Sequence, residues 1–274
     1  MQKKADLHVH TNLSDSTFTP EEVVRYATKI GLAAIAICDH DVVDGIDPAV
    51  EEAKKHGIEV IPGVELSAEY RNRELHILGY FIDHRNKGFR KKLQKTCRAR
   101  IGRIHKMLAM LKKKGIDLAP EDVFSIGGEG SVGRLHLAVA MFKKGLVGSV
   151  PEAFKKYIGD GGPCYVSNFN FTPERAIYEI VKAGGVPVLA HPYIAKLDKA
   201  IPHFVKHGLM GLEVYHPEHS PSTVKHYEDM ARQQGLLITG GSDCHGQGKS
   251  RILMGTVSVP YEIVDRLKAA ARAE

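Results

Sequence analysis

Histidine and carboxylate side chains crowd the beginning of the chain. In the run ADLHVHTNLSD, Asp6, His8 and His10 alternate with Leu7 and Val9. Alternate side chains of an extended strand point to the same face, so the three polar side chains are expected to share one face while the apolar pair packs on the other. Two imidazoles about 7 Å apart along a strand can close on one metal ion. Asp15, after a short loop, would add an oxygen ligand nearby.

Further side chains of the same chemical types follow the predicted strands. Most of them stand at carboxyl ends of strands, where the active sites of α/β barrels are built. Together with the opening run they make nine candidate metal ligands: His8, His10, Asp15, His40, Glu65, His76, His191, Asp243 and His245. One ion takes roughly four protein ligands. Nine candidates, with a bridging carboxylate, therefore predict two or three ions.

The donor types indicate which metals fit. Mixed imidazole and carboxylate ligation suits manganese, iron or zinc, and we favour manganese. The four cysteines form no CxxC pair, which argues against a structural zinc site or a disulfide framework and favours a reducing cytoplasm. Two ions about 3.5–4 Å apart can clamp the attacking and leaving oxygens of a phosphoryl displacement.

The pattern of elements around these residues predicts an α/β fold. Short apolar runs with strand character alternate with helical segments that begin at Thr-Pro-Glu or Ser-Pro sequences, such as Thr19-Pro20-Glu21. This alternation indicates a parallel sheet or barrel made of residues 1–83 and 166–274. It is interrupted at residues 84–165, which predict a mainly helical insertion that covers the substrate. Its first helix, residues 88–114, is expected to bury Leu93, Cys97, Ile101, Ile104, Leu108 and Leu111.

Charge is distributed unevenly along the 274 residues. The net charge is +6, yet residues 84–116 carry thirteen Lys and Arg and no acid, which leaves 25 Lys and Arg against 32 Asp and Glu elsewhere. The segment is either the solvated face of a helix or a surface that attracts polyanions such as RNA. No apolar run approaches the roughly 20 residues of a membrane span, and the strand-like start speaks against a signal peptide.

Six motifs in a fixed order now suggest a family. DLHVHTNLSD, CDHD, GVE, HILGY, AHP and GSDCHG resemble the motifs of the PHP (polymerase and histidinol phosphatase) family. The resemblance implies a distorted (β/α)7 TIM-like barrel with a trinuclear metal site. It also implies a ligand assignment: one ion on His8, His10, Glu65 and Asp243, a second on Glu65, His76 and His191, and a third on Asp15, His40 and His245.

A narrower resemblance concerns the insertion. Gly133-Arg134-Leu135-His136, followed by FKKYIGDGGPCYVSN, is similar to PHP phosphatases that act on 3′,5′-nucleoside bisphosphates and nucleoside monophosphates, a group with relatives that degrade short RNA from the 5′ end. It implies that Arg134 and His136 bind a substrate phosphate, a role that suits the planar fork of arginine. His219 matches a recurring histidine of that group and is expected to contact substrate.

These observations predict a metal-dependent phosphoesterase in which a metal-bound hydroxide, held by Glu65, Asp243, His8 and His10, attacks phosphorus. A small phosphorylated nucleotide, favoured as a 3′,5′-nucleoside bisphosphate, is the expected substrate. The alternatives are a 5′-3′ exonuclease on short single-stranded RNA or DNA, a histidinol phosphate phosphatase, and a metal-binding module without turnover. A metal-dependent amidohydrolase fits the motifs poorly. No membrane association and no obligate protein partner are expected.

Overall fold

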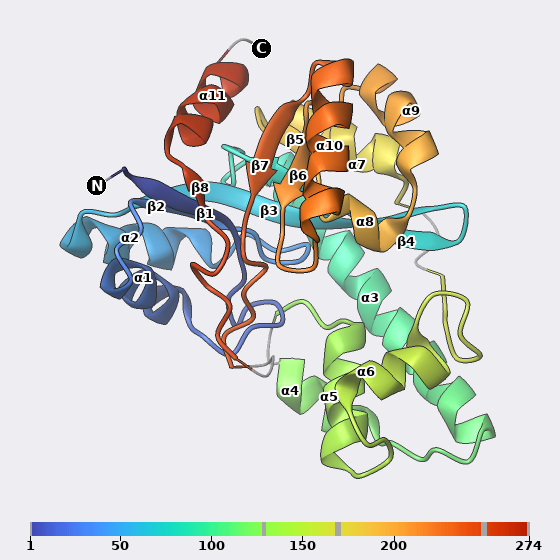
Figure 1. Cartoon of the computed structure of the whole chain (residues 1–274). Coiled ribbons are helices and arrows are strands. Elements are labelled where there is room, and N and C mark those ends of the chain that lie inside the picture. Colours follow the sequence, from blue (N-terminus) through green and yellow to red (C-terminus); the bar gives the residue numbers. More distant parts are fainter. Residues whose placement is uncertain (1, 128–129, 168–170, 248–250, 273–274) are drawn as a thin grey trace.

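A single curved sheet forms the frame of the molecule (Figure 1). The computed structural model describes residues 2–127, 130–167, 171–247 and 251–272. Eight strands are hydrogen-bonded in the order β7-β6-β5-β4-β3-β2-β1-β8. Their bounds are β1 Lys4–Val9, β2 Ala34–Ile37, β3 Glu59–Tyr70, β4 Arg73–Tyr80, β5 Val186–Leu189, β6 Gly211–Tyr215, β7 Leu237–Gly240 and β8 Val259–Pro260.

The two ends of this sheet meet beyond β7. Val9 forms an isolated parallel bridge with Cys244, and the amide of His10 donates to the carbonyl of Cys244 over 3.1 Å. Gly241 permits the contact, because a Cβ there would lie 2.4 Å from the His8 nitrogen. The sheet thus closes almost completely into a barrel, and the short antiparallel β8 is an addition at its edge. This architecture is the distorted TIM-like α/β barrel expected from the sequence.

Helices cover the outside of the barrel and bury an apolar layer against the strands. The covering helices are α1 Pro20–Lys29, α2 Ile46–His56, α7 Pro173–Lys182, α8 Pro192–Ala195, α9 Ile201–Lys206, α10 Pro221–Gln234 and α11 Glu262–Ala271, with a 3-10 turn η2 at Asp198–Ala200. The Thr19 side chain and Glu22 cap the start of α1 reciprocally, as the Thr-Pro-Glu sequence predicts. Strand residues such as Ile35 and Ile37 are fully or almost fully buried under these helices.

A β-hairpin replaces one of the helical crossovers. β3 and β4 pair in antiparallel register from Gly63↔Tyr80 to Tyr70↔Arg73, joined by Arg71 and Asn72 alone. Both turn residues have positive φ, of 51° and 61°, which is the conformation of a two-residue type I′ turn. β3 therefore extends beyond the GVE motif to Tyr70, and the sheet is mixed instead of purely parallel.

β1 also departs from a regular strand. Its register with β2 shifts between Asp6 and Val9, the mark of a bulge. As a result Leu7 and Val9, expected on one face, pack into different hydrophobic clusters. Asp6 likewise turns away from the other polar residues, and its carboxylate accepts hydrogen bonds from the amides of Ser242 and Gly255.

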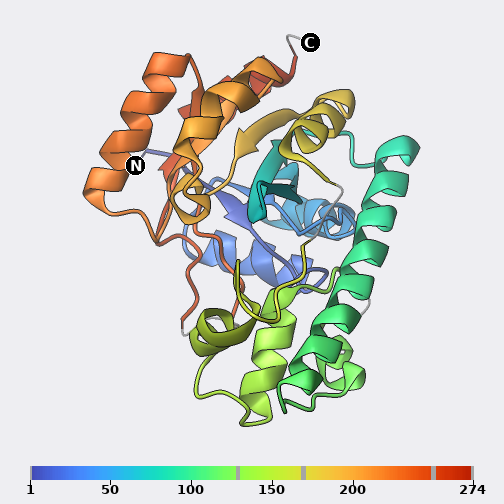
Figure 2. The ribbon, with the colours of Figure 1, turned by 90° about the vertical axis from the view of Figure 1, so that its right-hand side faces the viewer.

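The segment between β4 and α7 is mainly helical and lies beside the barrel (Figures 1 and 2). It contains α3 Lys87–Lys113, α4 Pro120–Gly127, α5 Arg134–Lys143, α6 Val150–Ala153 and the π-helical turn η1 Phe154–Ile158. A hydrophobic cluster of its own, built around Ile104, Leu111, Leu137 and Met141, holds these helices together. α3 runs from the barrel edge to the far end of the segment in Figure 2 and connects the two parts. The exact domain boundaries remain a prediction.

The basic face of α3 is less free than its sequence suggests. Ile101, expected in the core, is 40% exposed, whereas Arg100 and Arg103 are buried. Arg100 pairs with Asp41 and Arg103 with Glu74, both at 2.6 Å. Ion pairs to acids of the barrel therefore outweigh apolar periodicity in setting which way α3 faces. No helix in the described parts of the chain is long and apolar enough to cross a bilayer.

Candidate active site

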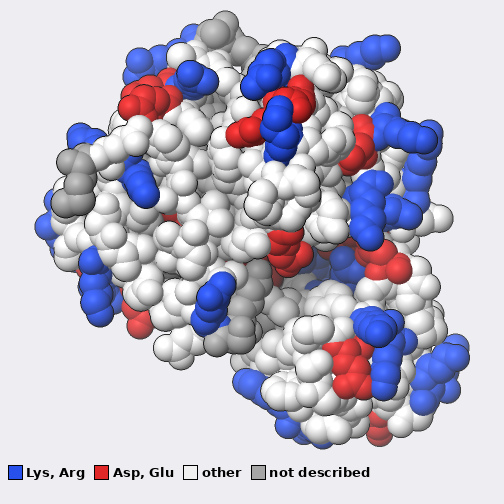
Figure 3. Space-filling view, viewed as in Figure 1, with Lys and Arg blue, Asp and Glu red and all other residues white. Residues whose placement is uncertain are grey.

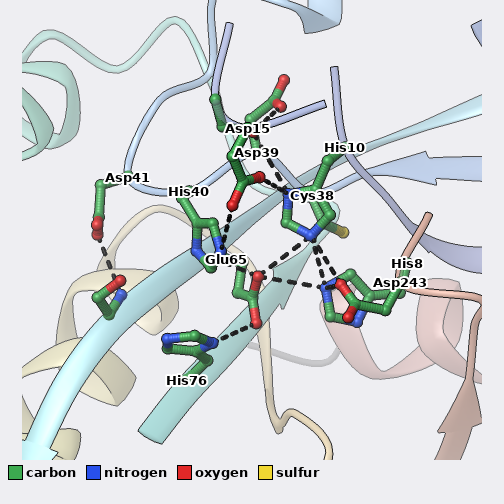
Figure 4. A network of polar contacts seen from close by, with 12 residues as sticks. His8, His10, Asp15, Cys38, Asp39, His40, Asp41, Glu65, His76 and Asp243 are labelled. Carbon is green, nitrogen blue, oxygen red and sulfur yellow. Dashed lines mark hydrogen bonds and ion pairs between the residues drawn. The ribbon is translucent and has the colours of Figure 1, made fainter. Parts of the chain in front are cut away.

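All nine candidate ligands meet at one end of the barrel. Figure 4 labels all of them except His191 and His245. β1 supplies His8, and His10 directly follows it. Glu65 and His76 face each other across the β3–β4 hairpin, where the Glu65 carboxylate lies 2.8 Å from His76 Nδ1. The remaining five stand in the loops that follow β1, β2, β5 and β7: Asp15, His40, His191, Asp243 and His245.

One set of four lies around the barrel axis. The Nε2 atoms of His8 and His10 are 3.1 Å apart, and each is 3.3 Å from the same Glu65 oxygen. Asp243 Oδ1 lies 3.2 Å from His10 and 3.6 Å from His8. One donor atom from each of the four side chains lies within 4.8 Å of the others, which suits a single ion. This set is the first one that the family resemblance implied.

Two further sets adjoin the first. His10, Asp15, His40 and His245 bring donor atoms within 4.8 Å of one another, and so do His40, Glu65 and His76. His191 Nε2 lies 3.0 Å from Glu65 Oε1 and 3.4 Å from His76 Nδ1. The sets share Glu65, His10 and His40, so the donors are arranged as a connected cluster for neighbouring ions. His10 and His40 each belong to two of these sets, whereas the expected assignment gave each of them to one ion.

The donors fit metal ions. Asp15 Oδ1 and His40 Nδ1 are buried without a hydrogen-bond partner, a condition that costs free energy unless a ligand satisfies them. Nitrogen and carboxylate oxygen donors without thiolate suit manganese, iron or zinc. The four cysteines carry free thiols, and burial raises the pKa of Cys38 far above its usual value, so that thiol stays protonated.

Electrostatics keeps the carboxylates ionised despite burial. Burial alone would raise the pKa of Glu65, but the surrounding imidazoles, His40 and His76 foremost, hold it well below its ordinary value. Burial alone would lower the pKa of His10, yet contacts with Asp243 and Glu65 raise it to about 9. The cluster thus attracts positive charge, and metal ions compete with protons for the same nitrogens.

A carboxylate that the sequence pattern did not single out orients two ligands. Glu213, fully buried in β6, accepts a hydrogen bond from His8 Nδ1 at 2.9 Å and another from the His191 amide at 2.8 Å. The first contact fixes the proton on Nδ1 and leaves His8 Nε2 free to bind a metal. In the sequence, the one signal for Glu213 is that it is a charged residue within the otherwise uncharged strand GLEVY.

Asp39 supports the loop that carries His10 and Asp15. Its carboxylate accepts hydrogen bonds from the Thr11 amide, the Thr11 hydroxyl and the Ser14 hydroxyl. The neighbouring Asp41 accepts from the Ser67 amide and pairs with Arg100. The two aspartates of the CDHD motif therefore tie the backbone on either side of His40 to neighbouring segments.

Arg134 lies beside the cluster and is already paired. At the start of α5, its guanidinium contacts Glu74 at 3.2 Å and Asp160 at 2.7 Å. The same Glu74 oxygen, Oε1, lies 3.3 Å from His76 Nε2. Burial would raise the pKa of Glu74, but Arg134 and Arg103 outweigh it and hold that pKa well below its usual range. One carboxylate therefore connects Arg134 to a candidate metal ligand.

The two remaining substrate candidates are histidines with one occupied nitrogen each. His136 is buried at the start of α5 and accepts the Gly133 amide on Nδ1 at 3.0 Å. His219 Nδ1 donates to the Val214 carbonyl at 2.8 Å, and its Nε2 is buried without a partner. His216, which sequence reasoning left without a role, lies between His219 and the cluster, 3.6 Å from Asp243 Oδ2.

Comparison with known proteins places this geometry in a family. Residues 6–126 match the model of the PHP domain. Over 247 residues the chain is 36% identical to the 5′-3′ exoribonuclease Rnm of Escherichia coli, covering 88% of this chain and 84% of that one. The chain belongs to the PHP family. It is also 31% identical to the 3′,5′-nucleoside bisphosphate phosphatase of Chromobacterium violaceum, over 89% of this chain and 88% of the relative.

Solved structures agree with this family membership. A Bifidobacterium adolescentis structure assigned to the metal-dependent phosphoesterases superimposes with a TM-score of 0.88 at 30% identity, over 97% of this chain and 95% of that one. The chain is a hydrolase, a metal-dependent phosphoesterase of the PHP family, as the motifs predicted. Ions held by the cluster would neutralise charge on phosphoryl oxygens and make water a nucleophile at neutral pH.

Proposed function

We propose that the chain hydrolyses the phosphate ester on the 3′ oxygen of a nucleotide, with 3′,5′-nucleoside bisphosphates as favoured substrates. The observation that carries the proposal is the contact of Glu74 with both Arg134 and His76, because it sets a phosphate-binding side chain beside the metal ligands. The names of the relatives support the nucleotide class, since one is a nucleoside bisphosphate phosphatase and another an exoribonuclease.

The nine clustered side chains are proposed as the metal ligands. Glu65, Asp243, His8 and His10 would hold the ion nearest the reacting water, and the other five would complete two further positions: Asp15, His40, His76, His191 and His245. Manganese is the favoured metal, with zinc or iron as alternatives. The donor set supports the presence of ions, and so do Asp15 Oδ1 and His40 Nδ1, which are buried without a hydrogen bond although each lies 3.2 Å from another donor of the cluster.

Other side chains of the protein would bind and position the substrate. Arg134 and His136 would hold a substrate phosphate, which requires Arg134 to exchange Asp160 or Glu74 for phosphate oxygens. An oxygen of water bonds to phosphorus, the bond from phosphorus to O3′ breaks, and O3′ takes up a proton. His219, whose Nε2 is buried and unpartnered, would contact the substrate at the leaving side.

A 5′-3′ exonuclease on short RNA or DNA is the second candidate. In an oligonucleotide the phosphorus on the 3′ oxygen of the first nucleotide carries the rest of the strand, whereas in a bisphosphate it carries none. Hydrolysis at that phosphorus describes both activities, so one site can serve both substrates. The 36% identity to an exoribonuclease favours this reading. We also propose a reducing cytoplasm as the compartment, which the free thiols of all four cysteines support.

A substrate comparison tests the proposal. With manganese present, we expect the highest kcat/KM for a 3′,5′-bisphosphate or a short 5′-phosphorylated RNA, a lower value for a nucleoside monophosphate, and little turnover of histidinol phosphate. Preference for histidinol phosphate would contradict the nucleotide assignment. Repeating the assay with zinc and iron ranks the metals.

Asp243→Asn tests the ligand assignment. The variant removes a charged donor from the central set, so kcat should fall at least a hundredfold while the circular dichroism spectrum is retained. Asp229→Asn, a surface carboxylate that pairs with Lys225 on α10, is the matched control and should keep normal activity. Near-normal turnover of Asp243→Asn would remove Asp243 from the site.

A further inference from the structure

Two adjoining hollows open on the surface beside the active site. The larger, about 940 Å³, lies between the β3–β4 turn, α8 and α9. The smaller, about 420 Å³, lies between the same turn, α8 and the loop at residues 160–161. They share Arg71, Arg73 and Lys196 in their walls. In Figure 3, Lys and Arg side chains, with Asp and Glu among them, lie on the right of the molecule, where Figure 1 places β4, α8 and α9.

The cations of these hollows are exposed and unneutralised. Among the described residues, no Asp or Glu forms an ion pair with Arg71, Arg73, Lys196 or Lys199. Asp198, the acid in the wall of the larger hollow, is engaged by the Tyr227 hydroxyl and His226. This contrasts with α3, where Arg100 and Arg103 are buried against acids. The hollows thus offer exposed cations for a polyanion, whereas these two arginines of α3 are not available to one.

Two of these cations occupy unfavourable backbone positions. Arg71, in the hairpin turn, and Lys196, at the end of α8, have φ of 51° and 53°. Glycine or asparagine adopts this left-handed conformation at lower cost. Each position therefore presents a long cationic side chain where a small residue would fit the backbone better, which points to a use for the charge.

An exposed aromatic ring stands between the hollows and the catalytic cluster. Tyr193, 47% exposed, follows the candidate ligand His191 by two residues and lines the larger hollow. Its ring lies 6.1 Å from that of His219. Exposed aromatic faces beside cations are the elements with which proteins bind single-stranded nucleic acids, by stacking on bases and pairing with phosphates.

The smaller hollow reaches the site from another direction. Asp160 in its wall is the partner of Arg134, and it also accepts the amide of Glu74. Arg73 precedes Glu74 in β4, so the strand points cations outward and site residues inward at successive positions. The surface that leads from Arg134 past Arg73 and Lys196 to Tyr193 is therefore continuous with the active site.

We propose that these two hollows bind the nucleotides on the 3′ side of the cleaved ester in a single-stranded oligonucleotide. The inference rests on the proposed function and names the substrate class, because a strand held this way extends beyond the first nucleotide. A nucleoside bisphosphate has no such nucleotides and does not reach the hollows. The structure thereby assigns oligonucleotides a binding surface that small substrates lack.

A charge-removal variant tests the proposal. The triple substitution Arg71→Asn, Arg73→Gln and Lys196→Asn removes three cations, and asparagine suits the two left-handed positions. We expect kcat/KM for a 5′-phosphorylated RNA of about six nucleotides to fall at least tenfold, while the value for a 3′,5′-bisphosphate changes less than about twofold. The slope of log KM against log salt for the RNA should decrease by about two, as roughly 0.7 per lost phosphate contact gives.

The matched control removes the same charge elsewhere. Lys91→Gln, Lys95→Gln and Arg98→Gln neutralise three basic residues of α3 that line no wall of the hollows. This variant should keep both activities and the original salt slope. A selective loss of RNA hydrolysis in the α3 variant, or equal losses on both substrates in the hollow variant, would overturn the proposal.

Tyr193→Ala separates nucleic acid from other polyanions. Loss of stacking should weaken RNA hydrolysis about tenfold, and polyglutamate of similar charge should compete poorly with RNA. Competition by polyglutamate as strong as by unlabelled RNA would mean general attraction of polyanions or of an acidic protein, and would overturn the assignment. If the wild type hydrolyses neither substrate, the proposed function fails by itself, whatever the variants do.

Discussion

At the scale of single residues, the site depends on buried carboxylates that touch no substrate. Glu213 holds His8 through its ring and His191 through its backbone, although these ligands come from β1 and from the loop after β5. Because such a partner fixes the tautomer and orientation of a ligating imidazole, its loss typically weakens metal binding without removing a ligand.

Glu213→Gln measures that support. The amide keeps the size of the side chain but loses the charge that stabilises the His8 proton, so metal affinity should fall about 10- to 100-fold. Isothermal titration with manganese gives the affinity. Glu228→Gln, which alters a hydrogen bond with Tyr215 at the rim of the same strand, should bind manganese normally. Equal affinity of Glu213→Gln and wild type would show that packing alone orients His8.

The residue types of the site could be predicted because the chemistry restricts them. Nine ligand candidates stood in short motifs at strand ends, where a barrel concentrates its functional side chains. Glu213 and His216 were not predicted, because neither stands at a spacing from other ligand types that would mark a metal site. Asp6 was misjudged, since a bulge that no local pattern reveals turns it toward the Ser242 and Gly255 amides.

At the scale of elements, α3 is fastened to the barrel by buried arginines. The Arg100 guanidinium pairs with Asp41 and with the Ser67 hydroxyl. Asp41 directly follows His40, and Ser67 lies two residues after Glu65 in β3. Asp41 has a φ of 56°, so its backbone conformation depends on the contacts that hold it. The helical segment thus stabilises the loop of a candidate metal ligand from outside the site.

Arg100→Met breaks this attachment. Removing one partner of a buried ion pair leaves Asp41 uncompensated and typically costs about 3–5 kcal/mol. Urea unfolding should show a loss of that order, and kcat should fall because His40 is less well held. Lys95→Met, exposed on the same helix, should change the unfolding free energy by less than about 0.5 kcal/mol. A stability of Arg100→Met close to the wild-type value would contradict the attachment.

Helix prediction from periodicity found α3 but not its orientation. A pattern of apolar residues assigned Ile101 to the core and the basic residues to solvent, whereas Ile101 is exposed and Arg100 and Arg103 are buried. The carboxylates that reverse this preference, Asp41 and Glu74, lie far away in the sequence. Long-range ion pairs of this kind have no local signature. The antiparallel β3–β4 hairpin was not predicted either, because its two turn residues, Arg71 and Asn72, include no glycine.

At the scale of the whole molecule, metal ions should be part of the stability. The cluster joins β1, the β3–β4 hairpin and the loops after β2, β5 and β7, so bound ions cross-link most of the barrel. An ion at 100 times its dissociation constant adds about 2.7 kcal/mol to the folded state. For a chain of this size we expect chelation to lower Tm by about 5–10 °C, measured by calorimetry with and without EDTA.

The difference in Tm between metal-bound and metal-free protein should also depend on pH. Contacts with carboxylates outweigh burial and raise the pKa of His10 to about 9 and that of His76 to about 10 in the absence of metal. Stability from these protonated imidazoles is complete below about pH 6.5 and is lost as pH rises to 9 or 10. The gap in Tm between metal-bound and metal-free protein should therefore widen over that range. A gap that narrows would contradict the competition between ions and protons.

The closure of the barrel between β1 and the loop after β7 has a consequence for biosynthesis. His8 and His10 are synthesised more than 230 residues before Asp243 and His245. At typical rates of about 5–20 residues per second, this separates them by roughly 10 to 50 seconds. The nascent protein therefore exposes an incomplete set of metal donors during translation, and the set around His8 and His10 is complete only when the loop after β7 has reached β1.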